Sequence, residues 1–267
     1  MASLKFWIAL LLTWQLAICR TIPEEDKIEL TPEQADILAS WTEDNKQNIW
    51  ELSGYFEGDM ILAADQRNGL INTKYRWANN EIPYEIDSVF NNAQRQWIIH
   101  SLTEYYNKTC VKPRFRTAND VDYVYITGAP TGCHSYVGRR GGRQVLNLQL
   151  NTPGVGCFRL GTIVHEFLHA LGFYHQQSAS ERDDYVDIIW QNIQEGKENN
   201  FNKYSSNVTT SFGEKYDYDS VMHYSAYAFS KNGERTIITK DPSAEIGQRL
   251  GLSDIDAIKL NKMYQCE

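Results

Sequence analysis

Hydrophobic residues recur along this chain at helical and strand spacings, and these spacings predict its main elements. At about 100° per residue, the apolar positions of residues 158–171 fall on one broad arc, which predicts a helix with one buried face. Residues 88–106 have the same periodicity and predict a second helix. Residues 82–86, 121–127 and 144–150 have patterns typical of strands.

The pattern also predicts shorter elements on both sides of this block. Residues 32–41 have modest helical patterning, and residues 186–199 predict one helix within a polar stretch. A variant of the capping box, Ser253-Asp254-Ile255-Asp256, predicts a final helix that runs through Met263. Together these elements predict a domain of the α+β class.

The first 19 residues have the pattern of a secretory signal. Lys5 supplies the basic start, residues 6–12 the apolar run, and Ala17-Ile18-Cys19 a small-x-small cleavage site. A membrane anchor is the alternative, but the run is shorter than the roughly 20 residues that a span needs, and Trp14-Gln15 interrupts it. We therefore expect a secreted, extracellular protein without a membrane partner.

Acidic residues are concentrated near the N-terminus. The chain has a net charge of −8, and residues 20–67 alone hold four basic and twelve acidic residues. The rest of the chain is therefore close to neutral. Because a nucleic-acid surface needs a basic face, no nucleic-acid partner is expected.

Cysteine usage predicts disulfides. Five cysteines become four once Cys19 leaves with the signal. An even count in an exported chain favours disulfides over free thiols, but the sequence alone does not choose among three possible pairings. The four are Cys110, Cys133, Cys157 and Cys266. Two sequons, at Asn107 and Asn207, also predict N-glycosylation.

Three histidines fall within eleven residues at zinc-ligand spacing: His165, His169 and His175. On a helix, the first two stack one turn apart on the side away from the apolar arc. Gly172 permits the left-handed conformation that ends a helix, so the turn after it can bring back the third. Three neutral imidazoles leave a zinc ion an open position for water, as in catalytic sites. Glu166, off the metal side, is then the candidate general base.

The alternative for this motif is a surface helix with two solvated histidines. A bare H-E-x-x-H is a weak signal, but Gly172 and His175 at the required offsets make a chance match far rarer. Further on, Ser220-Val221-Met222-His223-Tyr224 has the form of a methionine turn. Together the two stretches resemble the astacin family of zinc endopeptidases, which are metzincins.

The resemblance covers residues 56–266 and implies the metzincin fold. That fold has an N-terminal subdomain with a mixed twisted sheet and two long helices, and a mostly irregular C-terminal subdomain with a terminal helix. The active-site cleft lies between them. In the family the methionine, here Met222, lies beneath the metal. The tyrosine, here Tyr224, is an additional zinc ligand that swings to stabilise the tetrahedral intermediate. The family pattern also pairs Cys110 with Cys266 and Cys133 with Cys157.

The astacin pattern further implies an inhibitory pro-segment over residues 20–67. Phe56-Glu57-Gly58-Asp59 is similar to the family's F-x-G-D switch, in which the aspartate binds zinc in place of the catalytic water. Asp59 is thus expected to keep the precursor latent. Trp77 aligns with a tryptophan near the start of the family's mature chain, which places activation between Arg67 and Asn68 by a trypsin-like protease.

One position departs from the family. After activation, family members bury the new N-terminus against a glutamate that directly follows the third histidine, whereas this chain has Gln176. A neutral amide can accept a hydrogen bond from an ammonium, but without the charge the bond is roughly half as strong. We therefore expect a weaker lock on the new N-terminus.

The resemblance implies a monomeric endopeptidase, residues 68–267, that binds one zinc ion and cuts protein or peptide substrates. Because the sequence stops at Glu267, we expect a single-domain member without the modules that many relatives append. The edge around residues 133–137 could pair with an extended substrate by β-augmentation, as the family's cleft does. A second interpretation is a secreted pseudo-enzyme that binds a peptide or matrix partner, supported only by Gln176 and the altered residues after it. A third, a zinc aminopeptidase, would take its third ligand from a later glutamate, which His175 argues against.

Overall fold

The computed structural model describes residues 30–62, 72–205 and 209–266. The predicted signal, the activation site at Arg67 and Asn68 and the sequon at Asn207 lie outside these residues. Within them, none of the helices is both long and apolar enough to cross a bilayer.

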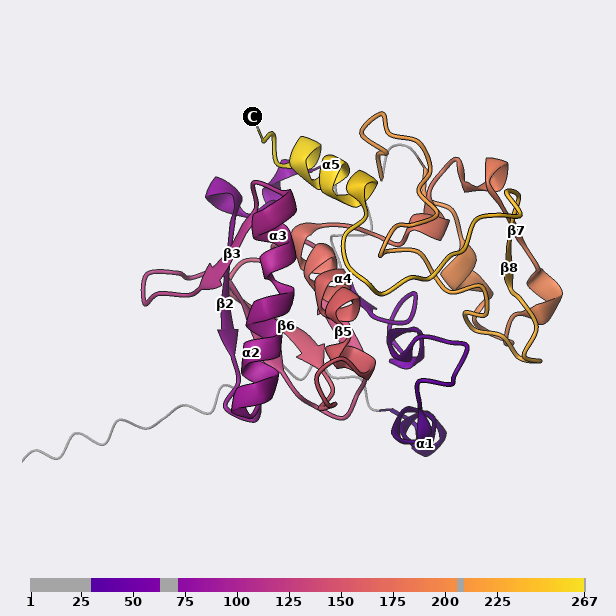
Figure 1. Cartoon of the computed structure of the whole chain (residues 1–267), viewed down its shortest axis with the longest axis horizontal. Helices are drawn as coiled ribbons and strands as arrows, with labels where there is room; N and C mark the ends of the chain where they lie inside the picture. The colour runs from indigo at the N-terminus through magenta and orange to yellow at the C-terminus, as the bar shows by residue number, and fades with distance from the viewer. Residues whose placement is uncertain (1–29, 63–71, 206–208, 267) are drawn as a thin grey trace, which may run out of the picture.

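A six-stranded mixed sheet organises the N-terminal subdomain (Figure 1). Its strands are β1 (Met60–Ile61), β2 (Glu81–Ile86), β3 (Lys112–Phe115), β4 (Tyr123–Thr127), β5 (Cys133–Tyr136) and β6 (Arg143–Leu148). Their order is β1-β5-β6-β4-β2-β3, with β5 antiparallel to β6 and the other neighbours parallel. β1 belongs to the predicted pro-segment, so the edge of β5 is covered by the chain's own N-terminal part.

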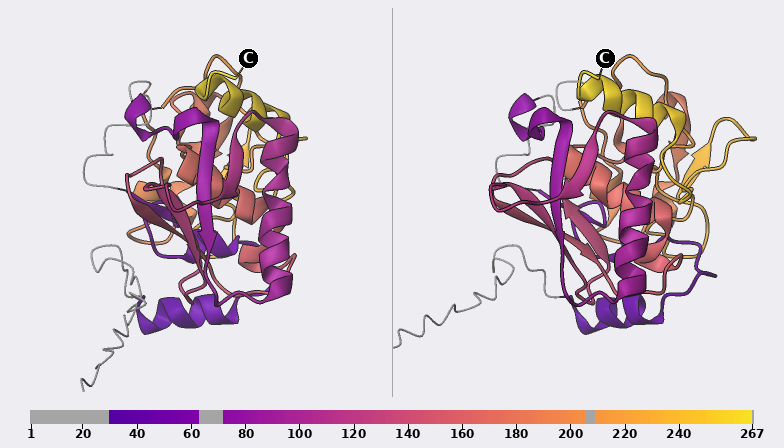
Figure 2. Two further views of the ribbon diagram at one scale, coloured as in Figure 1. Left: turned by 90° about the vertical axis from the view of Figure 1, so that its left-hand side faces the viewer. Right: turned by 60° about the vertical axis from the view of Figure 1, so that its left-hand side comes forward.

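Two long helical stretches lie beside the sheet. α4 (Leu160–Leu171) packs against β5 and β6, and α2 (Asn92–Ser101) packs against α4 on the same face (Figures 1 and 2). α3 (Thr103–Lys108) continues from α2. The single helix predicted over residues 88–106 is therefore interrupted. Hydroxyls on either side of the break, at Ser101 and Thr103, donate to carbonyls in the preceding turn and compete with the helical backbone bonds.

The C-terminal subdomain has little regular structure, as the right side of Figure 1 shows. β7 (Val186–Ile188) pairs antiparallel with β8 (Ile237–Thr239). The helix predicted over residues 186–199 is wrong, because its β-branched start pairs with this distant strand and Gly196, with φ of 79°, lies in its second half.

Both subdomains also contain single turns of 3-10 helix. They are Ile49–Leu52, Thr73–Tyr75, Ala78–Asn80, Gly156–Phe158, Gln176–Ser178, Arg182–Asp184, Trp190–Asn192 and Glu198–Phe201.

The two terminal helices begin as the sequence predicts. α5 (Asp254–Met263) starts with a capping box, in which the Ser253 hydroxyl accepts from the N–H of Asp256. α1 (Pro32–Ser40) has a capping box at Thr31. Two disulfides hold the domain, with Cα–Cα distances of 5.7 Å for Cys110–Cys266 and 5.6 Å for Cys133–Cys157. The first joins the segment after α3 to the end of the chain, and the second joins β5 to the turn before α4.

Candidate metal and active site

The histidine motif lies at the C-terminal end of α4. The helix ends before Gly172, whose φ of 115° is left-handed. The N–H of Gly172 donates to the carbonyl of His169 and that of Phe173 to Leu168, which closes the helix as a Schellman motif. The Phe173 carbonyl in turn accepts from Nδ1 of His169 at 2.7 Å. The turn brings His175 back, so that its ring centroid is 4.8 Å from that of His169.

The other two imidazoles are oriented in the same way. Nδ1 of His165 lies 2.8 Å from the carbonyl oxygen of Val221, and Nδ1 of His175 lies 2.9 Å from Oε2 of Glu57. These acceptors assign the ring proton to Nδ1 in each histidine. The three Nε2 lone pairs therefore face one another, and the Nε2 atoms of His165 and His169 are 3.1 Å apart.

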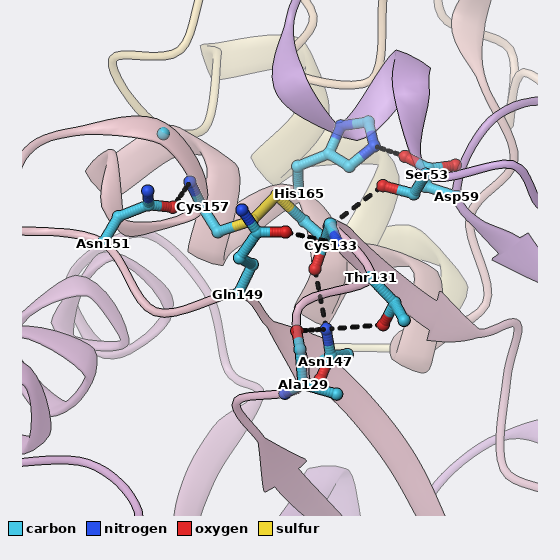
Figure 3. The surroundings of a disulfide bond; sticks show 12 residues. Ser53, Asp59, Ala129, Thr131, Cys133, Asn147, Gln149, Asn151, Cys157 and His165 are labelled. Carbon is cyan, nitrogen blue, oxygen red and sulfur yellow. Dashed lines mark hydrogen bonds and ion pairs between the residues drawn. A yellow bond between two sulfur atoms is a disulfide. The ribbon is translucent and has the colours of Figure 1, made fainter. Parts of the chain in front are cut away.

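Asp59 closes the cluster from the side of the predicted pro-segment. Its Oδ2 lies 2.9 Å from Nε2 of His165, and its Oδ1 lies 3.4 Å from Nε2 of His169 and 3.2 Å from Nε2 of His175. One ligand atom from each of these four residues lies within 4.8 Å of the others. Figure 3 shows Asp59 meeting His165 near the Cys133–Cys157 disulfide.

These four side chains fit a bound zinc ion. Burial lowers the pKa of His169 to about 3 and the pKa values of His165 and His175 well below the usual value, so the rings are neutral. Burial also raises the pKa of Asp59 well above its usual value. Four buried acceptors this close to one another are stable only when they share a cation, which is either a proton or a metal ion. Nε2 of His175 and Oδ1 of Asp59 are buried and lack a hydrogen-bond partner within the described chain. Imidazole nitrogen and carboxylate oxygen are ligands that zinc prefers.

Glu166 lies beside this cluster on α4 and is fully buried. Across the described residues, neither of its carboxylate oxygens has a hydrogen-bond partner. Burial and then the charge of Asp59 raise its pKa well above the usual value, against the opposing effect of Arg249. Buried carboxylates with a structural role are normally paired, so an unpaired one next to a metal cluster is typical of a proton-transfer group.

The methionine turn passes close to the histidines. The hydroxyl of Tyr224 donates to the carbonyl oxygen of Glu57 at 2.7 Å, and its ring centroid is 4.8 Å from that of His175. Burial raises the pKa of Tyr224 well above its usual value, so the phenol is protonated. In this state it is a donor to the predicted pro-segment, and its role as a zinc ligand stays a prediction. Met222 is buried, and its carbonyl accepts from the N–H of Gln176.

Comparison with known proteins decides the family. The model of the peptidase family described as Astacin matches residues 69–265. The chain belongs to the astacin family. This confirms the resemblance, the metzincin fold, the class of zinc metalloproteinases and zinc as the cofactor.

Relatives and solved structures agree with this astacin assignment. Zinc metalloproteinase nas-4 of Caenorhabditis elegans is 41% identical over 227 residues, which are 80% of this chain and 70% of nas-4. Nas-13 of the same organism is 44% identical over 270 residues and meprin A subunit beta of Homo sapiens 41% over 247; they match 92% and 88% of this chain. This chain spans only 58% of nas-13 and 33% of the meprin subunit. High choriolytic enzyme 1, a hatching enzyme zinc-protease of Oryzias latipes, superposes with a TM-score of 0.67 at 37% identity, covering 73% of this chain and 97% of that enzyme.

Two residues at the site of this astacin carry no recognisable motif in the sequence. Trp50 has no exposed surface and stacks on the rings of His165 and His175, with centroids 4.4 and 5.0 Å away. Glu51 accepts hydrogen bonds from the N–H and hydroxyl of Ser225 at 2.8 and 3.0 Å. Their only signal in the sequence is a tryptophan within a polar, acidic stretch shortly before the F-x-G-D motif.

Glu57 and Arg249 were also missed as site residues. The Glu57 carboxylate accepts from the hydroxyls of Tyr204 at 2.6 Å and Ser178 at 3.2 Å, and burial raises its pKa to about 8. Arg249 is buried with its guanidinium carbon 4.6 Å from the ring centroid of Trp50. Both residues are ordinary charged positions in the sequence, and only the fold brings them to the cleft.

The remaining candidates lie around this centre. The amide oxygen of Gln176 accepts from Nζ of Lys259 in α5 at 2.9 Å, so that acceptor already has an ammonium partner. His223 bonds to the hydroxyl of Tyr216 and the carbonyl of Tyr224, a structural role. Asn107 is exposed on α3.

Proposed function

We propose that this chain is a secreted zinc endopeptidase that hydrolyses protein or peptide substrates and is made as a latent precursor. One observation carries the proposal: three imidazole nitrogens and the Asp59 carboxylate converge on one point, next to the buried and unpaired Glu166. Such a set of groups suits the hydrolysis of a polar bond by water.

The proposed roles follow from the positions of the groups. His165, His169 and His175 hold the zinc ion. When bound there, zinc would polarise the scissile carbonyl and lower the pKa of water. Glu166 accepts a proton from the attacking water and returns it to the leaving amine. Tyr224, once released from the carbonyl of Glu57, donates its hydroxyl to the oxygen on which negative charge develops.

Residues 20–67 act as the inhibitory pro-segment in this proposal. Asp59 lies within the histidine cluster. The carbonyl of Glu57 accepts a hydrogen bond from the hydroxyl of Tyr224, and β1 pairs with the edge of β5. Cleavage between Arg67 and Asn68 by a trypsin-like protease would separate this segment from the catalytic domain. The family match that begins at residue 69 supports this boundary.

Export completes the proposal. Residues 1–19 are the signal that directs the chain out of the cell, and two disulfides support an oxidising destination. Asn107, exposed on α3, and Asn207 are the proposed glycosylation sites. The mature protein, residues 68–267, acts as a monomer, and neither nucleic acid nor membrane is a partner.

The test uses purified full-length chain treated with trypsin. We expect it to cut a peptide library, and a chelator should abolish cutting. Glu166→Gln should keep its zinc and lose about 10²- to 10⁴-fold in kcat/KM, because it cannot take the proton of water. Glu195→Gln, at an exposed glutamate, is the matched control and should cut normally. Near-normal cutting by Glu166→Gln would refute its role. A zinc-loaded wild type that cuts nothing would favour the pseudo-enzyme that binds a peptide or matrix partner.

A further inference from the structure

The pro-segment forms hydrogen bonds along the edge of β5. Three alternate N–H groups on this edge donate to it: Cys133 to the hydroxyl oxygen of Ser53 at 3.0 Å, Ser135 to the carbonyl of Asp59 at 3.0 Å, and Val137 to the carbonyl of Ile61 at 3.4 Å. Figure 3 shows the first of these contacts. Once the pro-segment leaves, the same groups are free to bind the backbone of an extended peptide.

A side chain of this strand also has a partner in the pro-segment. The ring of His134 lies against the ring of Tyr55, with centroids 4.1 Å apart and an interplanar angle of 32°. Both residues are buried, with 3% and 9% of their surfaces exposed. Phe56, the next residue of the pro-segment, stays 40% exposed, so the contact selects one aromatic side chain of two.

His134 has no role in the proposed chemistry. Its Nδ1 is buried and has no hydrogen-bond partner in the described part of the chain, while the backbone of Thr131 holds the ring. The neighbouring ring on the same strand, Tyr136, is already covered by the guanidinium of Arg140 at 4.2 Å. When Tyr55 departs, His134 is therefore left with an uncovered aromatic face at a strand edge.

We propose that His134 is a specificity-determining residue, whose ring forms one wall of a subsite for an aromatic side chain of the substrate. In the precursor Tyr55 fills this subsite. The inference rests on the proposed peptidase function, and it adds a preference at one position of the substrate. Aromatic pairs of this geometry correspond to about a 3- to 10-fold preference over an aliphatic side chain of similar buried area.

The experiment compares trypsin-activated full-length chains on one peptide library. The wild type should favour Tyr, Phe or Trp about 3- to 10-fold at a single position near the scissile bond. His134→Ala should lose this preference at that position alone, and His134→Phe, which keeps an aromatic face, should retain it. His100→Ala changes an exposed histidine on α2 and is the matched control.

Zinc content and thermal unfolding establish that each variant is folded. If His134→Ala does not fold, His134→Leu takes its place, because it keeps the bulk without the aromatic face. Active variants whose cleavage profile equals that of the wild type overturn the inference and leave the peptidase function intact. A zinc-loaded wild type that cuts no peptide overturns the peptidase function and the subsite with it.

Discussion

Trp50 is the residue of the proposed pro-segment whose removal tests the proposed latent state most directly. Its indole has no exposed surface and lies against the rings of His165 and His175. The guanidinium of Arg249 lies 4.6 Å from the indole centroid. Trp50→Ala therefore removes apolar burial, two ring contacts and a cation–π contact at once.

The size of the effect follows from this burial. Truncating a fully buried tryptophan to alanine costs about 3 to 5 kcal/mol, which corresponds to about 150- to 5,000-fold weaker binding of the pro-segment. Trp41 offers a matched control within the same segment. It is only half-buried, and the hydrogen bond from its Nε1 to the carbonyl of Gln47 stays within the segment. Trp41→Ala should therefore weaken binding on the order of 10-fold through lost apolar burial alone.

The assay measures inhibition in trans. Synthetic peptides of residues 30–62, with the natural sequence or with Trp50→Ala or Trp41→Ala, are added to the mature enzyme and their Ki values are compared. We expect the order natural, Trp41→Ala, Trp50→Ala, from tightest to weakest. The reasoning fails if Trp50→Ala inhibits within about 3-fold of the natural peptide, or if Trp41→Ala is the weaker of the two variants.

Two further changes test other parts of the structure. Asp59→Ala should give a precursor that is unstable or active without trypsin, because the histidine cluster loses its carboxylate; an equally silent and stable precursor would contradict this. Asp217→Asn tests a carboxyl whose pKa burial, and then Asp256, raise to about 6. Because the folded state binds this proton more tightly than the unfolded state, the proton stabilises the fold by up to about 3 kcal/mol. This contribution is fully present below about pH 4 and is lost as the pH rises through 6. The free energy of unfolding, measured from pH 4 to 7, should vary less with pH for the variant than for the wild type. An unchanged dependence on pH would count against the assignment.

The histidine helix could be predicted because every signal for it is local. Apolar periodicity gives its buried face, and Gly172 gives the turn that returns His175. The observed helix, Leu160–Leu171, starts two residues later than the predicted 158, because Arg159 has an extended backbone. The placement of Glu166 beside His165 follows from the same helix.

Elements that depend on distant partners could not be predicted in this way. Residues 186–188 begin a segment that is predicted as a helix, but they pair with Ile237–Thr239 from far along the chain. Glu51 and Glu57 likewise look like solvated acidic residues, yet each is buried on hydroxyls from Ser225 and Tyr204 in the C-terminal subdomain. The residues next to a carboxylate in the sequence do not predict its contacts with distant residues.

The distribution of these contacts determines what the proposed activation must achieve. Each inhibitory contact described above is made by residues 30–62, so a cut between Arg67 and Asn68 breaks none of them. What the cut removes is the covalent tether, which lowers the effective concentration of the segment from roughly millimolar to its actual concentration in solution. Release of the cleft is then a binding equilibrium, in which the burial of Trp50 opposes dissociation. The proposed latency therefore depends on the whole surface that the segment covers, and the Asp59 carboxylate is one contact among several.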